Sequence, residues 1–131
     1  MQHLLFAWIP LIFHGEFGPA SSTDKACDAF FAVKSYVAQH HQAGSTGTIS
    51  VLNFKSEQPK ASLHNVTFTG LLGPDGDFGS SKTFMLDGQT WEVKAEGLVS
   101  FDVLVAEVSA KLLKSGTKVC ETKAEFTGFA R

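Results

Sequence analysis

The stretch DKACDAFFAVKSYVAQHHQAG, residues 24–44, dominates the fold prediction. Apolar residues recur along it at the spacing of one helix face: Ala26, Phe30, Val33 and Val37. Ser22, Thr23 or Asp24 can cap the first turn, and Gly44 tolerates the left-handed stop. The stretch therefore predicts one long helix whose apolar face packs against the remainder of the chain.

The chain after Gly44 changes to patterns that are typical of strands. Two β-rich runs, 47–59 and 60–72, are expected to form an antiparallel pair that turns around Gln58-Pro59. Residues 73–81 concentrate turn formers and predict an exposed loop. Two further strands, 82–86 and 89–93, flank Asp87-Gly88, a dipeptide that suits a two-residue hairpin.

Residues 101–114 fit two interpretations. Helical spacing links Phe101, Leu104, Val105, Val108 and Leu112. A strand also fits, but its apolar residues change phase, so it would need a bulge near Val105-Ala106. We favour the bent strand, because Ser115-Gly116 then turns it into a closing strand. That last strand would point three side chains inward: Cys120, Ala124 and Phe126.

These elements predict a single α+β domain, with the long helix on a curved antiparallel sheet of about five to six strands. This layout resembles that of cystatin-like, NTF2-like and hot-dog domains. Cystatins carry Gln-x-Val-x-Gly in their first hairpin and Pro-Trp in the second. The chain has Gln58-Pro59-Lys60-Ala61-Ser62 at the first place, and Trp91 follows no proline. The resemblance therefore does not imply protease inhibition.

Residues 1–22 bear on the cellular compartment. The apolar run Leu4–Phe13, followed by small residues up to Ser22, matches the core and cleavage zone of a signal peptide, with Ala20 or Ser22 as the last residue removed. The alternative is an N-terminal strand, because the run is too short to span a bilayer as a helix. Residues 23–131 would then hold the domain.

Two other features agree with export. Asn65-Val66-Thr67 is an N-glycosylation sequon on a predicted strand, with the Asn65 side chain on the solvent face. The two cysteines, Cys27 and Cys120, could form a disulfide between the helix and the last strand in an oxidising compartment. The sequence thus predicts a secreted glycoprotein, with a cytoplasmic location if the N-terminus is retained.

Composition and motifs narrow the function. Eleven basic and thirteen acidic residues give a net charge of -2 without charged blocks, which argues against nucleic-acid and anionic-membrane binding. His40 and His41 end the predicted helix and His64 lies on a strand, without metal-ligand spacing. Asp75 and Asp77 begin like a calcium loop that lacks its later ligands. We expect no cofactor, no metal and no catalytic residues.

Three functions remain open. The first is a small secreted binding module without catalytic activity, whose partner is another protein. The second is a carrier of a small apolar ligand, or a small hot-dog or NTF2-like enzyme with an inward His64. The third is a subunit that assembles through its strand edges. Twelve phenylalanines predict an interior lined by rings, and four aromatic residues are candidates to line a ligand cavity: Phe54, Phe68, Trp91 and Phe126.

Overall fold

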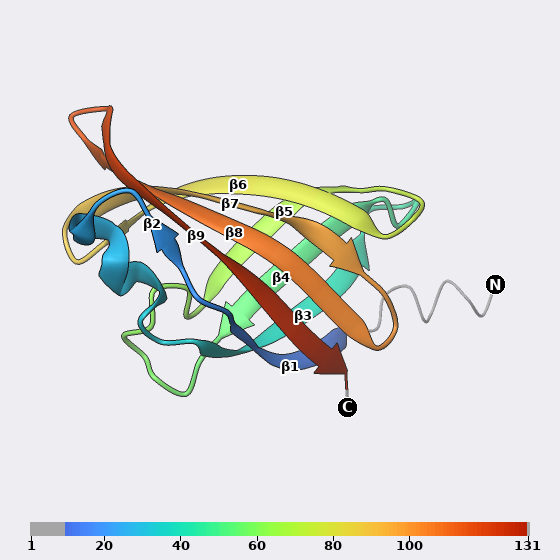
Figure 1. Ribbon diagram of the computed structural model, residues 1–131. Helices are drawn as coiled ribbons and strands as arrows, with labels where there is room; N and C mark the ends of the chain where they lie inside the picture. Colours follow the sequence, from blue (N-terminus) through green and yellow to red (C-terminus); the bar gives the residue numbers. More distant parts are fainter. Residues whose placement is uncertain (1–9, 131) are drawn as a thin grey trace.

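The computed structural model describes residues 10–130, which form nine strands and one short 3-10 helix (Figure 1). The elements in chain order are β1 (Leu11–Phe17), β2 (Ser21–Ser22), η1 (Lys25–Phe31), β3 (Ser35–Ala43), β4 (Ile49–Lys55), β5 (Val66–Leu72), β6 (Asp77–Leu86), β7 (Gln89–Val99), β8 (Val103–Lys114) and β9 (Thr117–Ala130). Within residues 10–130, no helix is long and apolar enough to cross a membrane.

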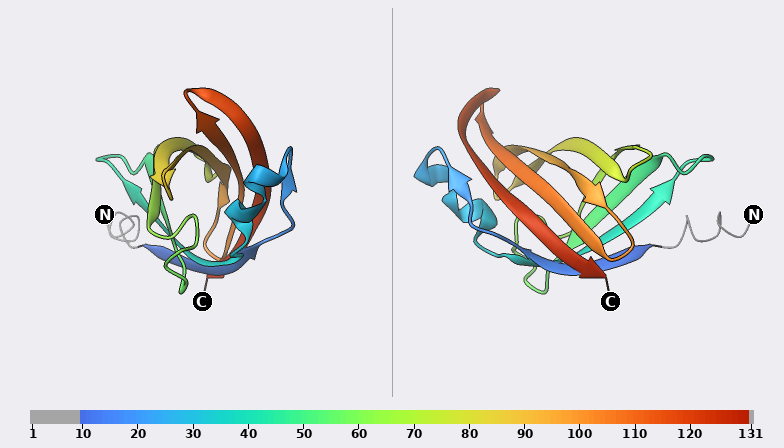
Figure 2. Two further views of the ribbon diagram at one scale, coloured as in Figure 1. Left: turned by 90° about the vertical axis from the view of Figure 1, so that its left-hand side faces the viewer. Right: turned by 45° about the vertical axis from the view of Figure 1, so that its right-hand side comes forward.

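The sheet closes into an antiparallel barrel of eight strands because β1 pairs on both of its edges. Neighbouring strands otherwise follow one another up and down the barrel, and β2 adds to β9 beyond β1. The view along the barrel shows the resulting ring of strands (Figure 2, left). Closure satisfies the backbone groups that an open sheet leaves unpaired at its edges.

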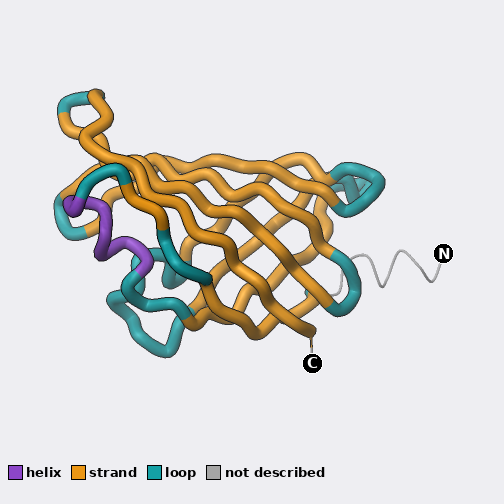
Figure 3. Tube along the Cα trace, viewed as in Figure 1, coloured by secondary structure: helices purple, strands orange, loops and turns teal. Residues whose placement is uncertain are grey.

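The barrel has two different ends (Figure 3). At the helix end lie η1, the long segment 56–65 between β4 and β5, and the β6–β7 and β8–β9 turns. At the rim end lie the turns 44–48, 73–76 and 100–102. We use these two names below.

The predicted long helix over residues 24–44 is wrong, and the α+β class with it. Asp24 does cap a helix, accepting a hydrogen bond from the N–H of Ala26 at 2.9 Å, but that helix ends at Phe31. The chain then becomes β3, in which Tyr36, Ala38 and His40 are buried on alternate positions. The period of two in the second half outweighs the apparent helical stripe, because burying these three side chains inside the barrel needs a strand.

Several strand predictions are confirmed. Asp87-Gly88 and Ser115-Gly116 form the tight turns between β6 and β7 and between β8 and β9, and all four residues have positive φ. In β9, the predicted inward side chains are buried: Cys120, Ala124 and Phe126. The runs around residues 47–72 contain β4 and β5, which pair antiparallel, but ten residues rather than a tight turn join them.

Two predictions about the later strands are wrong. The predicted loop 73–81 is shorter, because β6 already begins at Asp77. Residues 103–114 form strand β8, and its alternation continues without a bulge near Val105-Ala106. Every second residue from Leu104 to Leu112 faces the interior, so Val103 and Val105 face outward. The phase change in the sequence therefore marks apolar residues on the outer surface.

The predicted leader overlaps the barrel. Residues 4–9 lie outside the described residues, whereas Leu11–Phe17 form β1, with Phe13 and Phe17 buried in the core. Cleavage after Ala20 or Ser22 would remove β1 and both ladders that close the barrel. A leader that leaves this fold intact must therefore end before Leu11.

The seam between β5 and β6 is the incomplete part of the ring. Its backbone ladder covers only the pairs Leu71–Gly79 and Leu72–Phe78, whereas the β6–β7 ladder covers the full length of β6. Beyond Gly79, side chains of β6 replace the ladder: Ser80 donates to the carbonyl of Thr69 at 2.7 Å, and Lys82 to that of Thr67 at 3.3 Å. These bonds satisfy part of the exposed edge of β5.

Closure depends on a glycine in β1. Gly15 lies opposite Gly128 of β9, and a Cβ atom at Gly15 would overlap the carbonyl oxygen of Thr127. We expect Gly15→Ala to lower the free energy of unfolding by about 2 kcal/mol or more, because the backbones must separate. Urea unfolding followed by intrinsic fluorescence measures this change.

Gly18→Ala is the matched control. The N–H of Gly18 also donates a hydrogen bond to β9, to the carbonyl of Glu125 at 2.9 Å. The nearest atom to a Cβ added at Gly18 is 3.9 Å away. We expect a change within about 0.5 kcal/mol. Equal effects of the two substitutions would contradict the close approach of β1 and β9 at Gly15.

Candidate functional site

The interior near the helix end is filled by aromatic side chains. Of the predicted cavity residues, Phe54 has its ring centroid 6.1 Å from that of Phe68 and 5.4 Å from that of Phe126, and all three are buried. Phe17 contacts Phe54 and Phe126 as well, with centroids 6.0 and 5.2 Å away. The sequence correctly placed these phenylalanines inside the fold, and the structure shows one buried aromatic cluster.

Trp91 belongs to the same interior but to a neighbouring part of it. Its ring lies 4.7 Å from Phe30 of η1, and Phe30 contacts Phe31, which leads back to Phe17. The indole N–H of Trp91 is buried and has no hydrogen-bond partner among residues 10–130. The rings contact one another, so this part of the barrel is occupied by the protein's own side chains.

Tyr36 is the polar member of the cluster. Its hydroxyl oxygen accepts a hydrogen bond from the N–H of Leu63 at 3.2 Å, which fixes segment 56–65 against the helix end. Burial raises the pKa of Tyr36, and the bond from Leu63 offsets part of this rise. Leu63 and Ala61 are buried, so this long connection is part of the core rather than a free loop.

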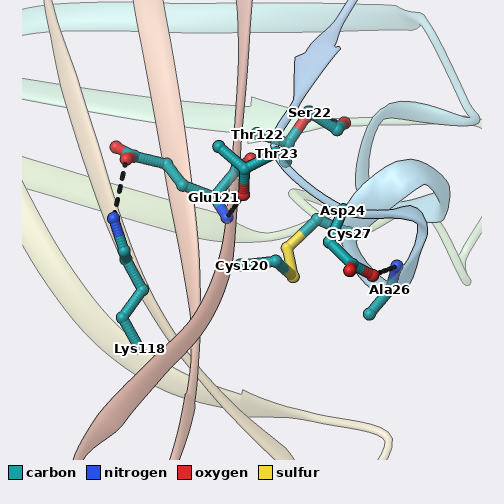
Figure 4. Close-up of a disulfide and its surroundings, with 9 residues drawn as sticks. All are labelled: Ser22, Thr23, Asp24, Ala26, Cys27, Lys118, Cys120, Glu121 and Thr122. Carbon is teal, nitrogen blue, oxygen red and sulfur yellow. Dashed lines mark hydrogen bonds and ion pairs between the residues drawn. A yellow bond between two sulfur atoms is a disulfide. The ribbon is translucent and has the colours of Figure 1, made fainter.

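The predicted disulfide between Cys27 and Cys120 is confirmed (Figure 4). It links η1 to β9 across 93 residues of sequence, and both cysteines are buried. Closing a loop of this length stabilises a fold by about 4 kcal/mol in the chain-entropy model. Beside it, Thr23 accepts a hydrogen bond from the N–H of Glu121 at 2.9 Å. The disulfide indicates an extracellular or other oxidising environment.

The interior toward the rim end contains a buried polar pair. Nε2 of His40 lies 2.8 Å from Oγ of Ser50, and the imidazole lies 6.1 Å from the ring of Phe78. Burial, and to a lesser degree the charge of His41, lowers the pKa of His40 from 6.5 to about 4. His40 is therefore neutral at physiological pH, and its solvent-exposed fraction of 3% leaves no access for a substrate.

The structure separates the other predicted polar residues. His41 lies on β3 next to His40, whose side chain faces the interior, and neither ends a helix. His64 lies in the segment before β5 rather than on a strand, and its Nδ1 accepts a hydrogen bond from the N–H of Ser56 at 3.0 Å. Asp75 lies in the turn before β6, and Asp77 is the first residue of β6. Within residues 10–130, no group of three or more potential metal ligands comes together.

Asn65 precedes β5 and is exposed, in the left-handed region with φ 64°. Its side chain is therefore accessible, and glycosylation at this position stays a prediction. A shallow depression lies elsewhere on the outer surface, over β3 and β4. Its lining includes His41 and Asn53.

The rim end carries an apolar surface feature that the sequence patterns did not predict. Five large apolar side chains are exposed toward the rim end: Ile12 of β1, Leu71 of β5, Leu98 of β7, Phe101 of the β7–β8 turn and Phe129 of β9. The last three lie on adjoining elements. Val105 pairs with Leu98, and Val103 pairs with Phe129, so these three residues and the two valines adjoin on the outer face. We call Leu98, Phe101, Val103, Val105 and Phe129 the rim patch. The sequence signal for the rim patch is the phase change at 101–105, which reflects apolar side chains on the outer face rather than the predicted bulge.

Comparisons with models of protein families, with characterised proteins and with solved structures find no match for this chain.

The low pKa of His40 makes stability depend on pH. Between pH 6.5 and about 4, the unfolded chain binds a proton at His40 that the folded chain does not bind. The free energy of unfolding should therefore fall as the pH falls through this range, by up to about 3 kcal/mol from this residue. His40→Gln removes the titrating group, so we expect its pH profile to lose this part of the decline.

The control for this experiment is His14→Gln, because His14 is an exposed histidine on the outer face of β1. This variant should keep the wild-type profile. Parallel profiles for wild type and His40→Gln would contradict a depressed pKa. If His40→Gln does not fold, the imidazole titration of His40 in the wild-type chain, followed by NMR, gives the same answer.

Proposed function

We propose that the chain is an exported, non-catalytic binding module that recognises a partner protein through the outside of its barrel. The disulfide supports export, because such a pair persists in oxidising compartments. The sequon at Asn65 lies on an exposed residue, which agrees with passage through a glycosylating compartment. A leader consistent with this proposal ends before Leu11, so that β1 remains.

The observation that carries the proposal is the rim patch. The exposed fractions are 85% for Phe101, 56% for Leu98 and 51% for Phe129. These side chains remain at the surface, whereas many other apolar side chains of the same protein are buried in its core. Adjoining exposed apolar residues with a polar border are typical of surfaces that bind other proteins. The interior supports the carrier alternative less well, because rings in mutual contact occupy it near the helix end.

Two observations argue against the remaining alternatives. An enzyme would need a reachable reactive group, whereas the His40–Ser50 pair is buried. Assembly through strand edges would need long unpaired edges, and barrel closure by β1 removes most of them.

Site-specific photo-crosslinking tests the proposal. A photoreactive phenylalanine derivative is placed at Phe101 in the full chain, which is then mixed with extracellular protein from its source. We expect a discrete crosslinked protein, because Phe101 would lie within the interface. Unlabelled wild-type chain should suppress the crosslink, whereas unlabelled Phe101→Ser should not.

The matched control places the same group at Met85, which is also apolar and 68% exposed but lies near the β6–β7 turn at the helix end. It should give no such product. The same crosslinks from both positions, or none from Phe101, would contradict recognition through the rim patch.

A further inference from the structure

The rim patch is a continuous part of three paired strands rather than a set of scattered side chains. Leu98 lies directly opposite Val105, and Val103 lies directly opposite Phe129, so each pair of side chains shares the outer face as cross-strand neighbours. Val103 and Val105 are half-buried. Each strand is paired on both sides, so a partner must contact the side chains and cannot extend the sheet there.

The turn that carries Phe101 is held by hydrogen bonds. Oγ of Ser100 accepts from the N–H of Val103 at 3.3 Å, and the N–H of Ser100 donates to the Val103 carbonyl at 2.9 Å. The N–H of Ala130 donates to the carbonyl of Asp102 at 2.9 Å, which ties the turn to β9. An exposed aromatic residue on a fixed turn loses little conformational entropy on binding, which favours its use as an anchor.

A row of three carboxylates borders the rim patch. Glu96 of β7, Glu107 of β8 and Glu125 of β9 lie side by side, since Glu96 pairs with Glu107 and Glu107 pairs with Glu125. All three are exposed, and within residues 10–130 only Glu96 has an ion-pair partner, Lys94 at 3.6 Å. We call these three residues the acidic row.

Glu107 and Glu125 form no ion pair within residues 10–130, although Lys94 and Lys123 lie two positions from the acidic row, toward the helix end of β7 and β9. Like charges directly opposite one another destabilise a sheet. A cation placed over the row would reduce this repulsion. The row lies about 7 Å from Leu98 and Val105, two positions along β7 and β8, and about 13 Å from Phe129, four positions along β9. The two features can therefore contact the same partner.

Among the described residues, the acidic side chains nearest the rim patch add to the same sign of charge. Asp77 pairs with Leu98, and Asp102 follows Phe101 in the turn. The three turns of the rim end, 44–48, 73–76 and 100–102, contain no lysine or arginine. A second copy placed face to face would bring carboxylates against carboxylates. An anionic membrane would also be repelled.

We propose that the rim patch and the acidic row together dock a segment of a partner protein that presents apolar side chains flanked by lysine or arginine. The apolar side chains cover Leu98, Phe101 and Phe129, and the cations lie over Glu107 and Glu125. This inference rests on the proposed function and adds the chemistry of the partner. It predicts attraction that salt weakens, together with an apolar contact that salt does not weaken.

The probe is a helical peptide with leucine on one face and lysine on the other, titrated into the full chain and followed by calorimetry. A peptide with glutamate in place of lysine is the comparison. We expect the lysine peptide to bind at least about tenfold more tightly. Phe101→Ser should weaken that binding strongly, whereas Met85→Ser should leave it unchanged, because Met85 is equally apolar but lies far from the rim patch.

Charge variants test the acidic row. We expect the double substitution Glu107→Gln and Glu125→Gln to weaken binding of the lysine peptide about fivefold. The matched control is Glu92→Gln with Glu121→Gln, which changes net charge equally, on β7 and β9, but lies nearer the helix end beside Lys111 and Lys118. This control should change binding less than about twofold.

Equal binding of both peptides, or equal effects of the two charge variants, would overturn the proposed partner chemistry. If the chain dimerises and Phe101→Ser abolishes dimerisation, the partner is a second copy of the chain and the proposal is wrong. If the chain binds vesicles of anionic lipid, the partner is a membrane and the proposal is also wrong. Photo-crosslinking from Phe101 tests the proposed function independently of the proposed partner chemistry. A crosslinked protein without preference for the lysine peptide leaves the proposed function standing and removes only the chemistry of the partner.

Discussion

Strand β1 hydrogen-bonds along both edges, to β3 over Leu11–Glu16 and to β9 over Phe13–Phe17. Without it, β3 and β9 would each present an unpaired edge, and Phe13 and Phe17 would be missing from the core. The close approach of Gly15 and Gly128 allows the ring to close there. Closure gives every strand of the ring one face toward a common interior, in which the buried residues lie.

The two ends of the barrel have different roles. At the helix end, η1 is linked to β9 by the Cys27–Cys120 disulfide, and Tyr36 holds segment 56–65, so this end is closed by covalent and core contacts. At the rim end the turns are short, and apolar residues face outward beside carboxylates. The stabilising contacts and the proposed binding surface are thus separated along the barrel, and substitutions in the rim patch should leave the core intact.

The local signals in the sequence were sufficient for the turns at Asp87-Gly88 and Ser115-Gly116, for most strands and for the disulfide. Residues 24–44 misled because Phe30 and Val37 match a helical period by coincidence, whereas the alternation of Tyr36, Ala38 and His40 acquires meaning only once the barrel has an inside. Closure joins residues more than one hundred positions apart, which no local pattern reports. The rim patch was missed for a related reason: Val103 and Val105 were assumed to be buried because they are apolar.

Native-state hydrogen exchange tests most directly whether β1 closes the barrel. The free energy of opening is measured for amides of Gly15 and Glu16 in β1 and of Thr127 and Gly128 in β9, and compared with that of global unfolding. If β1 closes the barrel, β1 and β9 open only with the whole protein, whereas Thr67 and Thr69, whose backbone groups face the incomplete β5–β6 seam, open at lower free energy. Exchange of β1 at a much lower free energy than β9 would show that the barrel remains folded without β1, and would contradict closure by β1.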